Sequence, residues 1–379
     1  MIPFNQTHVS TREVEQVRIA IESHQLSGDG PFTKTCHRRL GGLLAGAHTL
    51  LTHSATGALE MAALLADLAP GDEVIMPSFT FVSTANAVVL RGAVPVFVDV
   101  REDTLNIDEA LIEAAITPRT KAVMPVHYAG VGCEMDRILD IAQRHQLLVI
   151  EDAAQGIMAG YKGRPLGTLG DMAAISFHGT KNIGCGEGGA FVTRSAALAE
   201  RAELIREKGT NRSKFFRGQV DKYSWVATGS SYLPSELNAA VLDAQLQDAD
   251  AITQRRLALW NRYHEAFAGE EREGLWRRPI IPADCQHNGH IYYLLLPDLA
   301  RRTAFIDSMK ARGIGTTFHY VPLHSAPHAA TCSRNGSDLS RTENLSDRLV
   351  RLPLWPGLED RLDEVIAGAI GVGRNLCWA

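Results

Sequence analysis

The chain has 379 residues, 45% of them hydrophobic and 21% charged, so it can bury a large core and is expected to form two domains. Its formal net charge of -5 is spread without long blocks of one sign, so charge gives no reason to expect nucleic acid or an anionic membrane as a partner. The N-terminus lacks the pattern of a signal peptide and no run of about 18 apolar residues occurs, so we expect a soluble, cytoplasmic protein.

Helical and strand-like patterns alternate through the first two thirds of the chain. Val14, Val17 and Ile21 recur with the period of a helix over 13–22. A turn-rich loop at 26–32, a helix near 33–44, a strand at 49–52 and a helix entered through a small-residue turn at 54–57 come next. Further strands are expected at 73–76, 94–99, 122–126, 147–150, 173–177 and 189–193. Because most of these strands are short, almost wholly apolar and separated by helical lengths, they predict an α/β fold with a mainly parallel sheet covered by helices.

The final third has a different pattern. It predicts a long helix over 235–267, an apolar strand at 291–296, a helix at 301–312 and a short strand at 316–320. This order is typical of a smaller α+β domain, so we divide the chain into a large domain, 1–250, and a small domain, 251–379. The polar stretch 329–341 is predicted to be a surface loop.

Lys181 and Asp152 each follow an apolar strand at a point where ligands of parallel sheets bind. An aspartate and a lysine in these places are what a pyridoxal phosphate (PLP) enzyme requires. The lysine amine forms a Schiff base with the cofactor aldehyde, and the aspartate keeps the pyridine nitrogen protonated. Taken singly, a lysine in a loop is usually a solvated surface charge, and Asp152 could cap the next helix.

The remaining cofactor contacts are predicted around these two residues. Thr56 and Gly57 lie at the start of a helix, where backbone amides and hydroxyls bind phosphate, and Ser176 adds a second hydroxyl. Phe81 could stack on the ring, and Gln155 could contact its phenolic oxygen. The ordinary alternatives are a Ser/Thr helix cap, a core aromatic residue and a polar turn residue.

Several motifs in order resemble the DegT/DnrJ/EryC1/StrS family of sugar aminotransferases, PLP enzymes of the aspartate aminotransferase fold that act on nucleotide-linked keto sugars. The motifs lie at 28–32, 77–81, 98–100, 150–155, 176–181, 186–189 and 319–324, and so span nearly the whole chain. Within the family, the segments 27–33 and 229–236 are most similar to those of dTDP-4-amino-4,6-dideoxygalactose transaminases, which serve surface-polysaccharide synthesis.

The resemblance implies a role for each of the predicted cofactor-binding residues. It makes Lys181 the Schiff-base lysine and Asp152 the partner of the pyridine nitrogen, and it assigns the ring and phosphate contacts to Phe81, Gln155, Thr56, Gly57 and Ser176. It also implies a homodimer with active sites at the interface. Many relatives have an asparagine that reaches across the dimer to the phosphate, where this chain has Ser231.

The resemblance further implies amino transfer from L-glutamate to the C4 ketone of a nucleotide-linked 4-keto-6-deoxy sugar, with dTDP-4-keto-6-deoxy-D-glucose as the expected substrate. Relatives that dehydrate the sugar carry histidine at the lysine position, so Lys181 favours amino transfer. A PLP-dependent dehydratase and a 3-keto-sugar aminotransferase remain the alternatives, and the configuration at C4 and the nucleotide stay open.

Candidate substrate contacts are less specific. They are Phe32, Arg212, His319, Tyr320 and His324. The histidines could equally be structural, and the segment 211–217 could serve a dimer interface instead. No metal is expected, because the six cysteines lack the C-x-x-C spacing of a structural zinc site. The absence of a G-x-G-x-x-G motif after the first strand argues against a Rossmann dehydrogenase.

Overall fold

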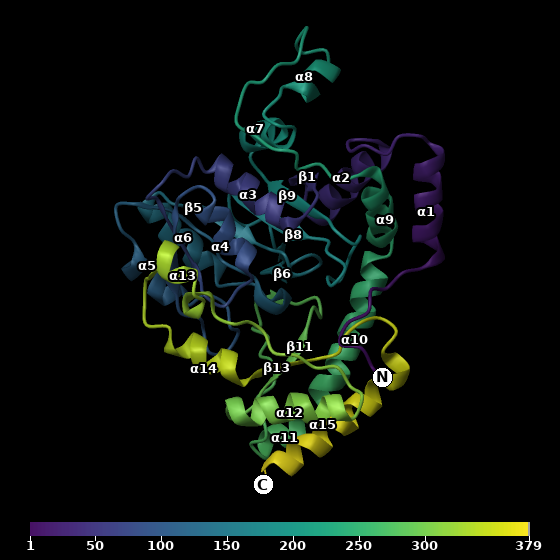
Figure 1. The fold of residues 1–379 in the computed structure, drawn as a ribbon, viewed down its shortest axis with the longest axis vertical. Helices are drawn as coiled ribbons and strands as arrows, with labels where there is room; N and C mark the ends of the chain where they lie inside the picture. The colour runs from purple at the N-terminus through teal and green to yellow at the C-terminus, as the bar shows by residue number, and fades with distance from the viewer. Residues whose placement is uncertain (378–379) are drawn as a thin grey trace.

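The computed structural model describes residues 1–377, and its centre is an eight-stranded sheet (Figure 1). In spatial order the strands are β1 (His48–Thr52), β9 (Gly189–Thr193), β8 (Met172–Ser176), β5 (Leu148–Asp152), β4 (Thr120–Val123), β2 (Glu73–Pro77), β3 (Val94–Val98) and β12 (Arg334–Asn335). Only β9 runs antiparallel to its neighbours, β1 and β8; the other pairs are parallel. The predicted mainly parallel sheet is confirmed.

Helices cover both faces of this sheet because both faces are apolar. In β8, Ala174 packs in one cluster with α3, whereas Ala173 and Ile175 pack on the opposite face with α2 and α9. The helices of the first two thirds of the chain are α1 (Thr11–Glu22), α2 (Pro31–Leu43), α3 (Ala55–Leu65), α4 (Val82–Val89), α5 (Ile112–Ala115), α6 (Met135–His145), α7 (Ala196–Arg206), α8 (Arg212–Phe216) and α9 (Glu236–Gln247). Two small strands, β6 (Gly160–Tyr161) and β7 (Arg164–Pro165), pair with β10 (Cys285–Gln286).

A second, aromatic-rich core lies below the sheet in Figure 1, around the two-stranded sheet of β11 (Tyr292–Leu295) and β13 (Leu349–Leu352). Its helices are α10 (Ala249–Ala266), α11 (Ala268–Arg272), α12 (Leu299–Ala311) and α15 (Leu362–Cys377). The prediction of one helix over 235–267 is wrong, because α9 ends at Gln247 and α10 begins at Ala249, with Asp248 as the cap residue between them. The predicted strand at 316–320 is also wrong: only Thr317 pairs, as an isolated bridge to Arg351.

The segment after the small helix α13 (Ala329–Cys332) returns to the large sheet. Arg334 and Asn335 form β12 and pair in parallel with Val96 and Phe97 of β3. The prediction of a surface loop over 329–341 is therefore wrong. A two-residue polar edge strand has no apolar alternation, so its sequence does not distinguish it from a loop.

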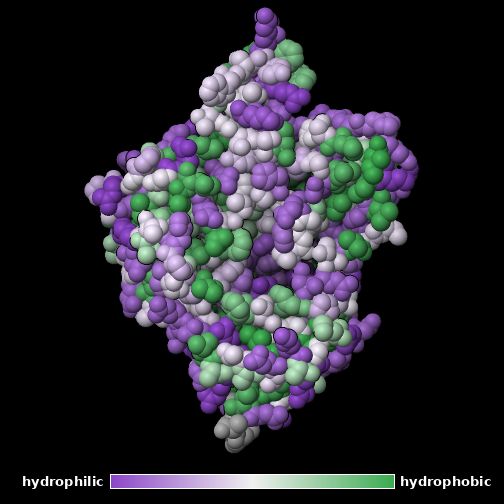
Figure 2. Space-filling view, in the orientation of Figure 1, coloured by the Kyte–Doolittle hydropathy of each residue, from purple (hydrophilic) through white to green (hydrophobic). Residues whose placement is uncertain are grey.

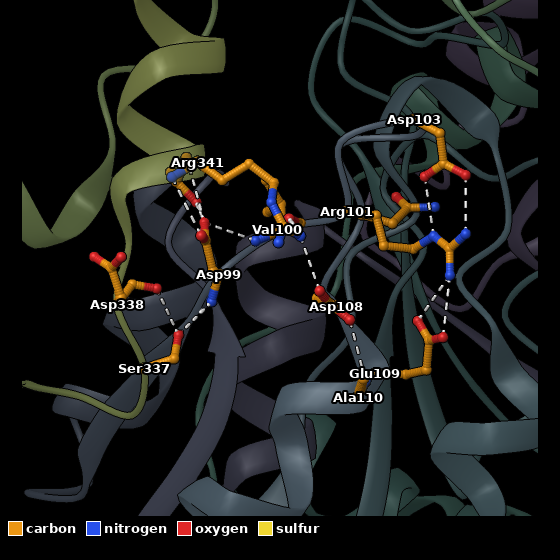
Figure 3. Close-up of polar contacts among 12 residues, drawn as sticks. Asp99, Val100, Arg101, Asp103, Asp108, Glu109, Ala110, Ser337, Asp338 and Arg341 are labelled. Carbon is orange, nitrogen blue, oxygen red and sulfur yellow. Dashed lines mark hydrogen bonds and ion pairs between the residues drawn. The ribbon is translucent and has the colours of Figure 1, made fainter.

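Asp99 fixes this returning segment at the end of β3 (Figure 3). Its carboxylate accepts hydrogen bonds from the backbone amides of Arg341 (3.2 Å) and Thr342 (2.8 Å) and from the Thr342 hydroxyl (2.6 Å). These amides belong to the first turn of α14 (Ser340–Arg348), where unpaired N–H groups favour an anion. The Asp99 amide donates to the Ser337 hydroxyl at 2.9 Å. Asp99 therefore binds the returning segment at two points, at Ser337 through its backbone and at the start of α14 through its carboxylate.

Replacing Asp99 with alanine is expected to lower the free energy of unfolding by about 3 kcal/mol, because several buried donors lose their acceptor. Urea denaturation followed by circular dichroism measures this change. Glu102→Ala is the control: its side chain is 69% exposed and reaches Arg277 at 3.5 Å, so its loss should cost less than about 1 kcal/mol. Equal destabilisation by the two substitutions would contradict the role given to Asp99.

Two further observations concern the described part of the chain. None of its helices combines the length and the hydropathy that a membrane span requires. Within residues 1–377 no three His, Cys, Asp or Glu side chains gather as a metal site would need.

Candidate active site

A cavity of about 650 Å³ opens at the carboxyl ends of the parallel strands, the size of a pocket for a cofactor with a small substrate. Asp152 ends β5 and Ser176 ends β8, and the segment after β2 brings Phe81 to the same edge. The start of α3 forms another wall with Thr56. Of the residues predicted from sequence, the cavity is lined by Thr56, Phe81, Asp152, Gln155, Ser176, Lys181, His319 and Tyr320.

Asp152 is buried, and its carboxylate is held in one orientation. Oδ2 accepts from the Thr84 hydroxyl at 2.7 Å, and Oδ1 accepts from the Ala154 amide at 3.1 Å. The Thr84 hydroxyl in turn lies 2.8 Å from that of Thr80. Two neutral donors orient the carboxylate without an ion pair, so its charge stays available to a cationic group in the cavity.

Lys181 follows β8 in a loop whose backbone turns back on itself. Its amide donates to the carbonyl of His178 at 2.8 Å, and Gly179 donates to Gly186 at 2.8 Å. The side chain is half-buried because it borders the cavity. Desolvation lowers the pKa of Lys181 to about 8, and the nearby charge of Asp152 acts in the opposite direction. A lysine with this pKa is neutral often enough near pH 7 to act as a nucleophile and base.

The rate at which PLP attaches covalently to the cofactor-free protein is expected to rise with pH and to level off above about 8, because only the neutral amine of Lys181 attacks an aldehyde. At pH 7 roughly one amine in ten is neutral at this pKa, against fewer than about one in a thousand for an ordinary lysine. Stopped-flow absorbance measures the rate. A rate that still climbs tenfold per pH unit between 9 and 10 would contradict the lowered pKa.

The first turn of α3 provides hydroxyl groups beside free helix amides. Ser54 accepts from the Gly57 amide at 3.0 Å and so caps the helix, and the Thr56 hydroxyl lies 2.8 Å from that of Ser83. The close approach of β9 to this turn requires glycine at 189, since a Cβ there would lie 2.4 Å from the Ala55 nitrogen. Gly57 itself does not line the cavity; its Cα faces His53 and Tyr232.

Phe81 and Gln155 border the space between Asp152 and Lys181. Phe81 is 58% exposed, so its ring is free to stack on a ligand. Gln155 is fixed at both ends: Oε1 accepts from the Ala129 amide at 2.7 Å, and Nε2 donates to the Tyr320 hydroxyl at 3.1 Å. Hydroxyls at a helix start, a buried acid, a lysine of lowered pKa and an exposed aromatic ring form a donor set that fits PLP.

Besides Gly57, four predicted residues lie outside the lining of this cavity. The His324 ring contacts the Ser78 hydroxyl through Nδ1 (2.6 Å) and Glu343 through Nε2 (3.1 Å), so both nitrogens have structural partners. Phe32 lies in the first turn of α2 and is half-buried against the core cluster that α2 shares with β8 and α9. Arg212 pairs with Glu207 at 3.1 Å, and Ser231 is exposed. Within the chain, these four residues do not line the cavity that contains Lys181.

The structure adds cavity residues that the sequence analysis missed, among them Phe4, Ser83, His290 and Arg351, together with Thr84 behind Asp152. Arg351 had a signal, a single charge within the apolar strand Leu349–Leu352. A charge in such a strand is costly and calls for a partner or a function. Phe4 and Ser83 had no comparable signal.

Comparison with known proteins agrees with the family predicted from the sequence. Residues 8–370 match the DegT/DnrJ/EryC1/StrS aminotransferase family. The chain is 35% identical over 374 residues to the spore coat polysaccharide biosynthesis protein SpsC of Bacillus subtilis, covering 96% of this chain and 95% of SpsC. The aminotransferase TlmJ from Streptoalloteichus hindustanus superposes with a TM-score of 0.91 at 29% identity, covering 100% of both chains. Spr1654 from Streptococcus pneumoniae, in its PMP form, gives a TM-score of 0.92 at 25% identity over 99% of this chain and 100% of its own, and a PLP form is also known.

Proposed function

Since the chain belongs to the DegT/DnrJ/EryC1/StrS aminotransferase family and is a PLP-dependent aminotransferase, we propose that its substrates are L-glutamate and a nucleotide-linked 4-keto-6-deoxy sugar. The expected reaction converts dTDP-4-keto-6-deoxy-D-glucose to dTDP-4-amino-4,6-dideoxy-D-galactose for surface-polysaccharide synthesis in the cytoplasm. One observation above all supports amino transfer: Lys181 and Asp152 line the same cavity. The name of SpsC, a polysaccharide biosynthesis protein, and the motifs at 27–33 and 229–236 support the sugar.

Bound PLP supplies an electron-accepting ring that stores the amino group between the two substrates. Lys181 takes the proton from the α-carbon of the donor and, in the second half of the reaction, delivers a proton to C4 of the sugar. The carboxylate of Asp152, oriented by Thr84 and the Ala154 amide, would keep the ring nitrogen protonated. The hydroxyls of Thr56 and Ser176, which line the cavity, would bind the phosphate, and Gln155, hydrogen-bonded to Tyr320, would contact the ring oxygen.

A homodimer is part of the proposal. It is supported by the segment around α8 (Arg212–Phe216), which projects from the body of the molecule. This projection stands clear of the body of the molecule in both views (Figures 1 and 2). It exposes large apolar side chains, among them Phe216 (69%) and Trp225 (79%). Such side chains are typical of a surface covered by a partner. In a dimer, Arg212 and Ser231 would be candidates to reach the site of the other subunit. The mass of the protein in solution tests whether the dimer forms.

The direct test is incubation with PLP, L-glutamate and dTDP-4-keto-6-deoxy-D-glucose, followed by NMR of the product. An amino group at C4 with galacto configuration supports the proposal. Loss of water without nitrogen transfer would identify a dehydratase, and a product only from the 3-keto sugar would identify a 3-aminotransferase. Initial rates at several fixed glutamate concentrations should give parallel double-reciprocal lines, because the amino group leaves the donor before the sugar binds.

A further inference from the structure

His290 lies just before β11 and is buried, and its hydrogen bonds fix which ring nitrogen carries the proton. Its Nδ1 lies 2.8 Å from Oδ1 of Asn182, the residue after Lys181. Asn182 donates through Nδ2 to the carbonyl of Asn288 at 2.9 Å, so the oxygen of its amide group is the atom that faces His290. An amide oxygen only accepts hydrogen bonds, and Nδ1 of His290 is therefore the protonated nitrogen.

The backbone beside His290 is also held by buried side chains. Arg256 donates from Nε to the carbonyl of Gly289 at 3.1 Å and from Nη2 to the carbonyl of His290 at 2.6 Å. Asn288 donates to the carbonyl of Gln155, a residue of the cavity wall, at 2.8 Å. These contacts fix the place of the His290 ring, which lines the cavity of the active site.

The second ring nitrogen of His290, Nε2, has no hydrogen-bond partner among residues 1–377. Burial and the nearby charges of Lys181 and Arg256 lower the pKa of His290 well below its usual value, so the ring is neutral near pH 7. In a neutral imidazole with its proton on Nδ1, Nε2 carries a lone pair and accepts hydrogen bonds. The cavity wall therefore presents an acceptor in a fixed place, and leaving that acceptor unpaired in a substrate complex would be costly.

The groups expected to enter the cavity differ in whether they can donate to this acceptor. The ionised carboxylates of glutamate and the phosphate of PLP are acceptors themselves, and the protonated ring nitrogen faces Asp152 in the proposed function. The amine of glutamate is the group that is transferred, so it is engaged at the reacting carbon. The hydroxyl groups of the keto sugar are the remaining donors near that carbon.

We propose that Nε2 of His290 accepts a hydrogen bond from the C3 hydroxyl of the keto sugar. This inference rests on the proposed function, in which the ketone is at C4. C3 is the one carbon bonded to C4 that carries a hydroxyl, because C5 carries the methyl group and the ring oxygen. The C3 hydroxyl therefore comes close to Lys181 when C4 reacts, and the charge of Lys181 acts on His290, which places the two side chains near each other.

A contact at C3 gives His290 a role in one half of the reaction. A site that pairs an acceptor with a substrate hydroxyl rejects an analogue that lacks the hydroxyl, because the acceptor then stays unpaired. His290 is thus a specificity-determining residue for the sugar, and it is dispensable when glutamate gives up its amino group.

The test compares dTDP-4-keto-6-deoxy-D-glucose with its 3-deoxy analogue in single-turnover reactions of the PMP form. The unchanged protein should react with the analogue about 10- to 100-fold more slowly at equal, subsaturating concentration. His290→Leu should remove this preference, because leucine has no acceptor to leave unpaired, whereas His290→Gln, whose amide oxygen can take the place of Nε2, should keep part of it. With L-glutamate and the PLP form, both variants should react within about threefold of the unchanged protein.

His48→Leu is the matched control. His48 is an exposed histidine of β1 that does not line the cavity, so this variant should keep the full preference for the C3 hydroxyl and both half-reactions.

A preference for the C3 hydroxyl that survives in His290→Leu would overturn the inference. A loss in the glutamate half-reaction equal to that in the sugar half-reaction, with an unchanged circular dichroism spectrum, would also overturn it and favour a contact between His290 and the amine of Lys181. The same comparison of half-reactions in His290→Gln decides the question if His290→Leu does not fold.

The unchanged protein separates this inference from the proposed function. If it makes the amino sugar from both sugars at equal rates, the inference fails and the proposed function stands. If it transfers no amino group to the 4-keto sugar, the proposed substrate fails and the inference fails with it.

Discussion

Lys181→Met should lower turnover by at least about 10⁴-fold, because the substitution removes both the amine that holds the cofactor covalently and the group that moves the proton. Methionine nearly keeps the volume of the side chain, so the cavity should stay intact. The effect is measured as the initial rate of 2-oxoglutarate formation from glutamate. The absorption band of the lysine-linked cofactor should also be absent, even where phosphate contacts retain PLP without the covalent link.

Lys310→Met, on the exposed side of α12, is the matched control and should leave turnover and absorption unchanged. Circular dichroism should show the same fold for all three proteins. Turnover within about tenfold of the unchanged protein in Lys181→Met would remove the assignment of Lys181, since general acid–base catalysis alone contributes at least 10²-fold.

Asp152→Asn should lower turnover on the order of 10²–10³-fold, the loss typical of one oriented electrostatic partner. The amide fits the space but carries no charge to keep the pyridine nitrogen protonated. The same change should lower the pKa of Lys181 below about 8, since the charge of Asp152 raises it. Cofactor attachment to the variant should then level off at a lower pH than in the unchanged protein.

The two effects of Asp152→Asn are separable, because attachment is measured on the cofactor-free protein and turnover on the loaded enzyme. Asp284→Asn is the control, since Asp284 is exposed and lies 3.5 Å from Lys162, away from the cavity. A variant that keeps full turnover would show that another group protonates the ring. A variant with an unchanged attachment profile would show that Asp152 and Lys181 are farther apart than their electrostatic coupling implies.

The central part of the site was predictable because each residue follows an apolar strand. Asp152 ends β5 and Ser176 ends β8, and parallel strands bring their carboxyl ends to one edge. Arg351 was not predictable in the same way. It lies in the second sheet, and only the docking of that sheet over the cavity brings the two together.

The incorrect predictions have similar causes. His319 and His324 are five residues apart, yet the 3₁₀ turn at Leu323–Ser325 directs His324 toward Ser78 and Glu343 and away from the cavity. The break at Asp248 divides a stretch that is helical on both sides, so periodicity alone predicts one helix. Local sequence patterns describe single elements, whereas these features depend on how elements pack.

The return of the chain to β12 has a consequence for dissecting this protein. A fragment ending at residue 250, where sequence composition suggests a domain boundary, would lack Arg334 and Asn335 and leave β3 as an open sheet edge. It would also leave the Asp99 carboxylate without Thr342. Unpaired strand edges promote association between chains. We therefore expect a fragment of the first 250 residues to be less stable and more prone to associate than the whole chain, because the last strand of the large sheet comes from residues 334–335.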